Sequence, residues 1–392
     1  MKKLNWVLID SFRKDYLKHA PFLDEICKTR SRLEPVVGYQ QYLASFFTGM
    51  QPDRINVWNI FRYSKNSSLF GWTRFLPKLS LFDIKQIKYG LDLLSYLKIR
   101  TLDMSKVEIP ISIMKNFDLS MRKSITAPNV LDVPTVFDKL RENNLTFTYI
   151  KGSIYDEGKA SVSSISHILR RSDLQSIELA KKSNSALRFL YLVELDGISH
   201  RFGPTSKEVK EHIKTIDAEL EDLLKGENVI MQSDHGMVET KKKINIEQKL
   251  DGLGYRNGRD YLMFLDSVIA RFWFFNKKAK EEIMKLLRDT KGGKILADAE
   301  KKKLGIFFND KRYGELFFIA DYGNVIVPNY FQKEIPKGMH GYLPERDEYG
   351  IFGSNIKGMQ KGQVHYTDIA PTILDYFNIR LTCNGKSLIV RN

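Results

Sequence analysis

Cysteine is nearly absent from this chain of 392 residues, which contains only Cys27 and Cys383. Neither belongs to a CxxC pair, and two cysteines do not make a disulfide framework. The sequence also lacks an apolar stretch of about 18 residues, the length that a membrane-spanning helix needs, so it predicts none. The apolar run at the N-terminus is short and ends at Asp10, which indicates a first β-strand rather than a signal peptide.

Recognisable nucleic-acid modules are missing as well: there is no zinc-finger spacing and no RNP-type strand. The net charge is nevertheless +15, with a pI near 9.4. A strongly basic chain without such a module favours a small anionic partner or an acidic lipid surface over DNA or RNA. We expect a cytoplasmic protein, with peripheral contact to an anionic membrane as a further option.

The chain is long enough for one large domain that carries an insertion. Apolar runs alternate with helical patterns, and three of these runs, at 4–9, 188–195 and 228–232, are followed within two residues by Asp. This βα alternation predicts an α/β fold with a central, mostly parallel sheet and helices on both faces.

A stretch of about a hundred residues separates His235 from His340 and has elements of its own. It contains a strand-like segment at 261–275 and a helical pattern at 277–289. We therefore expect an inserted α/β cap at 240–335, with residues 1–239 and 336–392 forming the core domain.

Aspartate and histidine recur at the ends of the predicted core strands and in the loops that follow them. In open α/β sheets, ligands collect at the carboxyl ends of strands. Carboxylate and imidazole together suit Zn²⁺ and tolerate Mn²⁺ or Fe. The sequence thus predicts a site for two divalent metal ions, formed by Asp10, Asp196, His200, Asp234, His235 and His340.

Several motifs in chain order resemble one known group, the alkaline phosphatase superfamily in its type I phosphodiesterase/nucleotide pyrophosphatase branch. They are VLIDSFRKDYL, FFTGMQPD, LDGISHRFGP, SDHGM, the HGY turn, and VHYTDIAPTILDYFNI followed by NGKSL. Together they span nearly the whole chain. The resemblance implies an alkaline phosphatase-like core and hydrolysis of phosphoric esters.

The resemblance also implies how the ligands divide. Asp196, His200 and His340 would bind one metal, and the other would be bound by Asp10, Asp234 and His235. Two such ions about 4 Å apart would hold the phosphoryl group during transfer.

The chain departs from the family at the attacking group. The family places Ser or Thr shortly before the sequence that appears here as Thr48-Gly49, and the matching positions are Tyr39 and Gln40. Three hypotheses follow. Tyr39 could attack through its phenolate, a metal-bound hydroxide could attack while Gln40 orients the phosphate, or the protein has lost turnover and only binds its ligand.

Two further segments carry hypotheses. Arg271 and Trp273 in the predicted cap combine a phosphate-binding group with a stacking surface, so they could hold the base or sugar of a substrate or pack in the core of the cap. An amphipathic helix at 81–98, rich in lysine, could pack on the domain or contact a membrane.

We therefore expect a two-metal phosphodiesterase or pyrophosphatase. Its substrate would be a nucleotide, a nucleotide-sugar or a lipid-linked phosphate. The alternative is an impaired member of the family that binds metal and a phosphorylated ligand without turnover.

Overall fold

The structure is a computed structural model of the 392-residue chain. It describes residues 2–38, 42–67, 69–71, 107–152, 154–157, 172–360 and 362–390. The predicted helix at 81–98 lies outside these ranges. None of the helices in the described ranges combines the length and apolar character needed to cross a bilayer.

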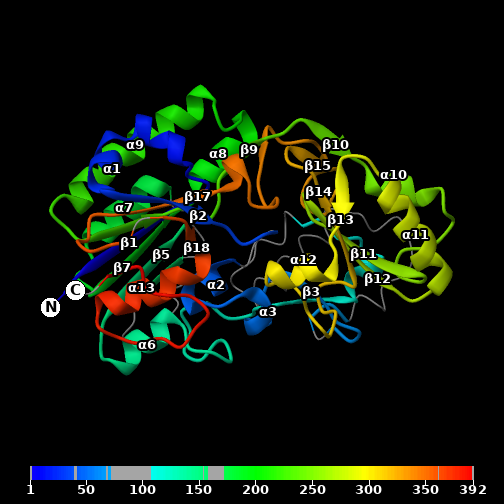
Figure 1. Ribbon diagram of the computed structural model, residues 1–392, viewed down its shortest axis with the longest axis horizontal. Coiled ribbons are helices and arrows are strands. Elements are labelled where there is room, and N and C mark those ends of the chain that lie inside the picture. Colours follow the sequence, from blue (N-terminus) through cyan, green and yellow to red (C-terminus); the bar gives the residue numbers. More distant parts are fainter. Residues whose placement is uncertain are drawn as a thin grey trace.

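An eight-stranded sheet forms the centre of the larger lobe, on the left of Figure 1. Four of its seven strand pairings are parallel. The fold class predicted from the sequence is therefore confirmed. In spatial order the strands are β18 (Val364–His365), β2 (Thr29–Glu34), β17 (Gly350–Ser354), β8 (Val229–Gln232), β1 (Leu4–Ile9), β7 (Leu187–Leu192), β5 (Phe147–Lys151) and β6 (Ile154–Glu157).

Helices cover both faces of this sheet (Figure 1). Strand β1 is buried at every position, as expected for a parallel strand packed on two sides. One face carries η1 (Lys14–His19), α1 (Pro21–Ile26), α7 (Asp173–Lys181), α8 (Glu194–Phe202) and α9 (Lys207–Leu224). The other carries α2 (Tyr42–Thr48), α6 (Val136–Glu142) and α13 (Ile369–Tyr376).

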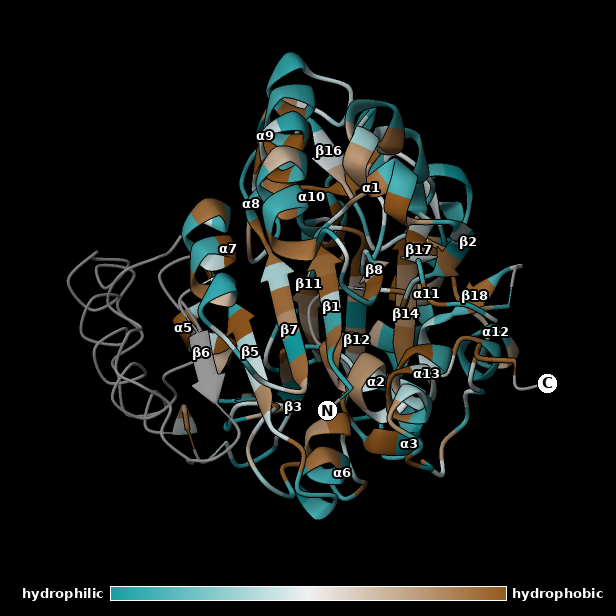
Figure 2. Cartoon of the chain, turned by 90° about the vertical axis from the view of Figure 1, so that its left-hand side faces the viewer, coloured by the Kyte–Doolittle hydropathy of each residue, from teal (hydrophilic) through white to brown (hydrophobic). Residues whose placement is uncertain are grey.

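Helix α9 shows how the sequence specifies this layering. Ser206 caps its first turn by accepting a hydrogen bond from the Val209 backbone N–H. Its buried side chains recur every three or four residues, as in Val209, Ile213, Ile216 and Leu220, so one stripe faces the sheet. Figure 2 shows the result: β1 is hydrophobic along most of its length, whereas α9 is mostly hydrophilic on its outer side.

The second lobe, on the right of Figure 1, is built on a four-stranded antiparallel sheet. The strand-like segment at 261–275 is a hairpin of two strands rather than one. In spatial order the strands are β11 (Tyr261–Leu265), β12 (Ile269–Phe274), β14 (Leu316–Ala320) and β13 (Gly293–Ile295). The other elements of this region are β10 (Lys242–Ile244), α10 (Ile246–Asp251), α11 (Lys277–Asp289), α12 (Asp298–Lys303) and β15 (Asn324–Ile326).

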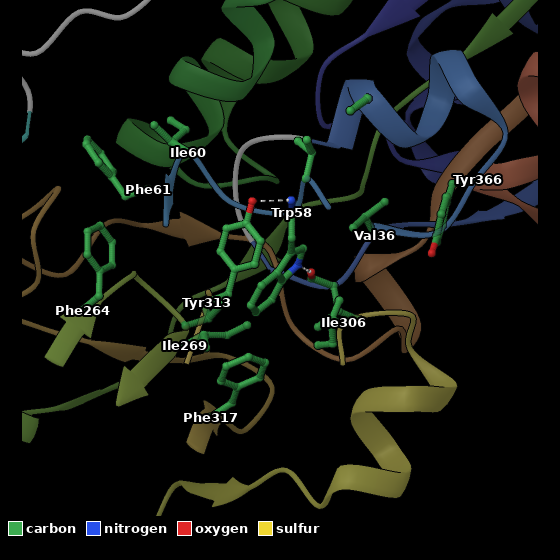
Figure 3. Packing of buried hydrophobic residues seen from close by; sticks show 14 of the residues in the cluster. Val36, Trp58, Ile60, Phe61, Phe264, Ile269, Ile306, Tyr313, Phe317 and Tyr366 are labelled. Atoms are coloured by element: carbon green, nitrogen blue, oxygen red, sulfur yellow. Dashed lines mark hydrogen bonds between the residues drawn. The ribbon is translucent and has the colours of Figure 1, made fainter. Parts of the chain in front are cut away.

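Residues from outside 240–335 complete the core of this lobe. Strands β3 (Phe61–Tyr63) and β4 (Phe117–Leu119) pair with each other, and their aromatic rings pack on the hairpin. The ring centroids of Phe61 and Phe117 lie 5.5 and 5.1 Å from that of Phe264. Trp58, which lies just before β3 in the chain, packs beside Tyr313 and Phe317 (Figure 3). The boundaries predicted for the cap stay a prediction.

Short elements link the lobes and complete the chain. They are α3 (Pro52–Ile55), α5 (Ile111–Met114), β9 (Val238–Glu239), β16 (Gly338–Met339), η6 (Arg346–Glu348) and η7 (Tyr366–Asp368). Strand β16 pairs antiparallel with β9. This pairing returns the chain from the second lobe to the carboxyl edge of the central sheet.

Candidate metal centre

Asp10 and Asp234 meet because their strands are neighbours. Asp10 directly follows β1, and Asp234 follows β8 after Ser233; the two strands run parallel and side by side. Ser11 adopts a positive φ of 57°, which turns the chain sharply after Asp10. The Ser11 backbone N–H donates to Asp234 Oδ1 at 3.1 Å. The carboxyl edge of the sheet thus holds two buried carboxylates in adjacent loops.

Asp196 and His200 lie one turn apart on helix α8. The sequence predicted Asp196 at the tip of a strand spanning 188–195, but β7 ends at Leu192 and Asp196 lies within the helix that follows. The i, i+4 spacing places both side chains on one helical face. His200 Nε2 accordingly lies 3.3 Å from Asp196 Oδ2.

A reciprocal cap fixes the start of α8. The Asp173 carboxylate accepts hydrogen bonds from the Val193 and Glu194 backbone N–H groups. In return, Glu194 Oε2 accepts from the Asp173 backbone N–H at 2.8 Å. His212 Nε2 lies 3.0 Å from Asp173 Oδ2, so these three side chains are also close enough to hold a cation. Because these carboxylates already accept backbone hydrogen bonds, we assign the group a structural role.

His340 reaches the same edge through the β9–β16 pairing. It follows β16 directly, and its ring stacks on that of His235 with centroids 3.6 Å apart. The next residue, Gly341, donates its backbone N–H to Glu348 Oε1 at 2.6 Å. The Gly341 carbonyl accepts from the Gly38 backbone N–H at 3.0 Å. The turn that carries His340 is therefore held from two sides.

Two of the three imidazoles are oriented as metal ligands. His200 Nδ1 lies 2.7 Å from the Gly338 carbonyl oxygen, and His235 Nδ1 lies 2.8 Å from that of Gly236. A carbonyl oxygen only accepts, so each Nδ1 carries a proton and Nε2 is the ring nitrogen left to bind a metal. Such carbonyl contacts fix the tautomer and orientation of metal-binding histidines.

The Nε2 atoms face the carboxylates and form two overlapping ligand groups. His235 Nε2 lies 3.4 Å from Asp10 Oδ1, and His340 Nε2 lies 3.6 Å from Asp196 Oδ1. Within each group the ligand atoms lie within 4.8 Å of one another. The groups are Asp196, His200 and His340, and Asp10, Asp196 and His235. Asp196 belongs to both, so it lies between the two candidate positions.

Asp234 is held more tightly by the protein than the other two carboxylates. Its Oδ1 accepts from the backbone N–H groups of Ser11 and His235, and its Oδ2 lies 3.5 Å from His235 Nε2. By contrast, Oδ1 of Asp10 and of Asp196 are buried and accept no hydrogen bond from any described residue. Buried oxygen atoms without a donor are the chemistry that a divalent cation satisfies. The residues present therefore fit a metal centre.

The electrostatics of the cluster favour bound positive charge. Burial, together with the charges of Asp234 and Asp196, raises the pKa of Asp10 well above its ordinary value. For Asp196, burial acts in the same direction, but His200 and the other two imidazoles outweigh it and lower its pKa. Burial and the neighbouring His235 lower the pKa of His340, which keeps that ring neutral. For His200, burial acts to lower the pKa, but the Asp196 charge outweighs it and raises that pKa. Three carboxylates this close repel one another, and a bound cation would relieve the repulsion.

Tyr191 is a residue of this centre that the sequence analysis did not single out. Its hydroxyl lies 2.6 Å from Asp10 Oδ2 and 3.0 Å from Asp234 Oδ2, so it connects two predicted ligands. The residue lies near the carboxyl end of β7, in register with Leu8 of β1. A tyrosine within an apolar strand reads as core, which is why its polar end was not recognised.

The other predicted site residues have different outcomes. Tyr39 and Gln40 lie outside the described residues; the described chain stops at Gly38 and resumes with α2 at Tyr42. Arg271 is fully buried in the second lobe, and Trp273 is almost so. Arg271 donates to Asp266 Oδ2, the Phe61 carbonyl and Asn59 Oδ1. This placement favours a structural role, and the predicted substrate contact stays untested.

Comparison with known proteins is consistent with this geometry. A family model described as type I phosphodiesterase/nucleotide pyrophosphatase matches residues 116–343, more than half of the chain. The human ectonucleotide pyrophosphatase/phosphodiesterase 5 structure matches with a TM-score of 0.67 and 17% identity, covering 98% of this chain and 97% of that one.

Two murine structures of the same name match similarly. One has a TM-score of 0.67 at 16% identity, covering 98% of each chain. The other is an inactive variant in complex with AMP, with a TM-score of 0.64 at 17% identity and the same coverage. At these identities the likeness shows a shared fold. A search of curated proteins found no match.

Proposed function

Because the chain belongs to the type I phosphodiesterase/nucleotide pyrophosphatase family, we propose that it is a metal-dependent phosphoric-ester hydrolase with a two-metal centre at the carboxyl edge of the central sheet. The observation that carries the proposal is the convergence of three carboxylates and three imidazoles from four separate segments. Two of these carboxylates retain buried oxygen atoms that accept no hydrogen bond from any described residue.

The residues that would hold the metals follow from the contacts. Asp196, His200 and His340 would bind one ion. Asp10 and His235, together with Asp234 or Asp196, would bind the other. Zinc suits this mixture of carboxylate and imidazole, and manganese or iron are the alternatives. Bound divalent metals would neutralise charge on the phosphoryl oxygen atoms and lower the pKa of an attacking oxygen.

The surrounding residues would hold these ligands in place. The carbonyl groups of Gly338 and Gly236 keep the proton of His200 and His235 on Nδ1, so that Nε2 stays available. The Tyr191 hydroxyl fixes the spacing of Asp10 and Asp234. Glu348 holds the turn that carries His340. A site prearranged in this way spends little free energy on reorganisation when substrate binds.

For the substrate we propose a nucleotide-type phosphoric ester. The murine relative was solved in complex with AMP, and its fold matches this chain over 98% of each length. A net charge of +15 would also attract such an anion. Nucleotide-sugars and lipid-linked phosphates share the same reacting group, so an ester panel should include all three classes.

The attacking group is the open element of the proposal. Tyr39 and Gln40 stand where the family places Ser or Thr. In one version the Tyr39 phenolate attacks phosphorus; in the other, water attacks and Gln40 orients the phosphate. Tyr39→Phe separates them, because it abolishes turnover in the first version and leaves it largely intact in the second.

The proposal is tested by metal analysis combined with an ester assay on the same sample. We expect two divalent metals per chain after loading with Zn²⁺ or Mn²⁺, and cleavage of a p-nitrophenyl phosphodiester or phosphomonoester. Asp234→Asn should abolish that cleavage, because it removes a carboxylate charge next to Asp10 and His235. A protein that binds no metal after loading would refute the ligand assignment.

A second function is favoured by one observation, the absence of Ser or Thr at positions 39 and 40. In this version the chain binds metal and a phosphorylated ligand without cleaving it. Two bound metals, with tight phosphate binding but no cleavage across the ester panel, would support it.

We also propose a cytoplasmic location with peripheral contact to anionic membranes. The basic charge of the chain supports the contact with membranes. Cell fractionation tests the location. Salt-sensitive sedimentation with vesicles of phosphatidylserine and phosphatidylcholine tests the contact.

A further inference from the structure

Lys151 is a charged residue at the metal centre that the proposed mechanism does not use. It is the last residue of β5, which runs parallel to β7, and it pairs in register with Tyr191. Paired residues on neighbouring parallel strands project from the same face of the sheet. The Lys151 ammonium accordingly lies 4.7 Å from the centre of the Tyr191 ring.

The face on which Lys151 projects is the one covered by α2. Tyr149 precedes Lys151 by two residues and therefore points to the same side. Its ring packs on that of Phe47 in α2, with centroids 6.2 Å apart. Lys151 thus stands at the carboxyl edge of the sheet, on the side where α2 begins.

The charges around Lys151 come from the metal centre. Its side chain is half-buried. Burial lowers the pKa of the ammonium, and the carboxylates of Asp10 and Asp234 act against that change. Among the described residues, however, Lys151 forms no ion pair with either carboxylate, whereas the surface lysine Lys181 pairs with three acidic residues. Lys151 is therefore a cation held near the centre by the Tyr191 ring, without an acidic partner in contact with it among the described residues.

The Tyr191 ring and the charges of Asp10 and Asp234 explain the position of Lys151 only as long as the centre holds no metal. Two divalent metals would more than neutralise the three carboxylates, so the loaded centre and Lys151 would repel each other. Solvent and the Tyr191 ring offset part of this repulsion, and a nearby anion would offset more of it. The substrate of the proposed function supplies that anion.

We propose that Lys151 is a substrate-binding residue whose ammonium donates a hydrogen bond to a non-bridging oxygen of the bound phosphate group. The proposal rests on the proposed function and adds a determinant of specificity to it. A fixed positive charge interacts more strongly with a dianion than with a monoanion. Lys151 therefore favours phosphate groups that carry two negative charges over the single charge of a phosphodiester.

The test measures anion binding by calorimetry on zinc-loaded protein, which requires no turnover. Inorganic phosphate and methyl phosphate are the dianionic probes, and dimethyl phosphate is the monoanionic one. We expect Lys151→Met to weaken binding of the dianions about tenfold and that of dimethyl phosphate much less. Lys151→Arg should restore most of the affinity, because it keeps the charge.

Lys182→Met is the matched control, since Lys182 is an exposed lysine at the end of α7 and its loss changes the net charge equally. Zinc content is measured for every variant. A second measurement uses the wild-type protein alone: phosphate should protect Lys151, but not Lys182, from acetylation followed by mass spectrometry. This experiment works even if Lys151→Met does not fold.

The outcomes separate this inference from the proposed function. If zinc-loaded Lys151→Met binds inorganic phosphate as tightly as the wild type, or if phosphate leaves Lys151 unprotected, the inference is overturned, whether or not esters are cleaved. If phosphate binding depends on Lys151 but no ester is cleaved, the inference stands and the hydrolase proposal fails.

Discussion

The molecule buries two groups of charged side chains, and they are balanced in opposite ways. The arginine cluster of the second lobe consists of Arg271, Asp266 and Asn59. The carboxylate cluster of the central sheet consists of Asp10, Asp196 and Asp234. Five of these six side chains are buried, and that of Asp196 is 22% exposed. In the arginine cluster one guanidinium faces one carboxylate, whereas in the other cluster three carboxylates face imidazole rings.

The two clusters also differ in the neighbouring groups that compensate their charge. The Arg271 guanidinium uses all three nitrogen positions as donors and lies 4.4 Å from the Phe264 ring centre. The ring centres of Trp58 and Tyr313 each lie 5.9 Å from its central carbon. Oxygen atoms of Asp10 and Asp196 accept no hydrogen bond from the described residues, and neither does Asp266 Oδ1. The difference is that Asp266 has the Arg271 guanidinium 3.2 Å from its other oxygen, whereas no arginine or lysine forms an ion pair with Asp10 or Asp196 among the described residues. Buried charge that the protein neutralises itself contributes to the fold; buried charge that it leaves uncompensated indicates a ligand.

The largest expected effect tests the carboxylate cluster at Asp196, the residue common to both ligand groups. We expect Asp196→Asn to lower metal-dependent ester cleavage by at least about 100-fold, because a neutral amide binds Zn²⁺ far more weakly than a carboxylate does. Metal content should fall with it. Both are measured on protein loaded under identical conditions.

Stability supplies the contrast at the neighbouring ligand, Asp10. Burial and the other two carboxylates raise its pKa, so its charge destabilises the metal-free fold. Without metal, the free energy of unfolding of Asp10→Asn should therefore equal or exceed that of the wild type. Urea denaturation in the presence of a chelator measures it. A large loss of metal-free stability would mean that Asp10 belongs to the fold, and the distinction between the two clusters would fail.

In the arginine cluster, substitution should lower the stability of the protein and leave its metal binding unchanged. Arg271→Met leaves the Asp266 carboxylate buried without its cation, which costs about 3–5 kcal/mol of unfolding free energy. The double variant Arg271→Met/Asp266→Asn should recover part of that loss, because it removes both charges. Zinc content of the folded fraction should stay at the wild-type level. Loss of phosphate binding in stable, zinc-loaded Arg271→Met would instead support the predicted substrate contact.

The sequence predicts the carboxylate cluster better than it predicts the arginine cluster. Asp10 and Asp234 follow short apolar strands of a parallel sheet, so their convergence at one edge follows from topology alone. His340 was identified by its motif, but its arrival depends on the pairing of β9 with β16, two strands of two residues each. Such short elements carry too little pattern to be predicted.

The arginine cluster shows what local patterns cannot provide. Arg271 follows Ala270 in an aromatic strand, and its sequence neighbours fit a ligand-binding surface as well as a core. Its partners Asn59 and Phe61 are more than 200 residues away along the chain. The burial of Arg271 is therefore a tertiary property, which only the packing of β3 against the hairpin of β11 and β12 creates.

The pH dependence of stability gives a smaller test. Burial raises the pKa of Asp266 from 3.8 to about 6, against the opposing effect of Arg271. A carboxyl group whose pKa is raised by folding stabilises the protein at low pH, and this contribution is lost as the pH rises through its folded pKa. Between pH 4 and pH 6.5 the wild type should therefore lose on the order of 2 kcal/mol relative to Asp266→Asn. Parallel urea titrations in chelator measure the difference, and equal pH profiles would contradict it.

The smallest expected effect is at Tyr191, which connects Asp10 to Asp234. Tyr191→Phe keeps the ring that packs in the core but removes the hydroxyl that both carboxylates contact. Substituting a residue that orients metal ligands typically changes metal affinity by about 10- to 100-fold. We expect the lower end here, because Asp234 keeps its two backbone hydrogen bonds.

Competition with a chromogenic chelator measures the zinc affinity of Tyr191→Phe. Tyr149→Phe serves as the control, since it removes a hydroxyl from the same sheet face two residues before Lys151. If Tyr191→Phe binds zinc as the wild type does, the carboxylates are positioned by the backbone alone. In that case the geometry of the carboxylate cluster would not depend on neighbouring side chains, whereas that of the arginine cluster does.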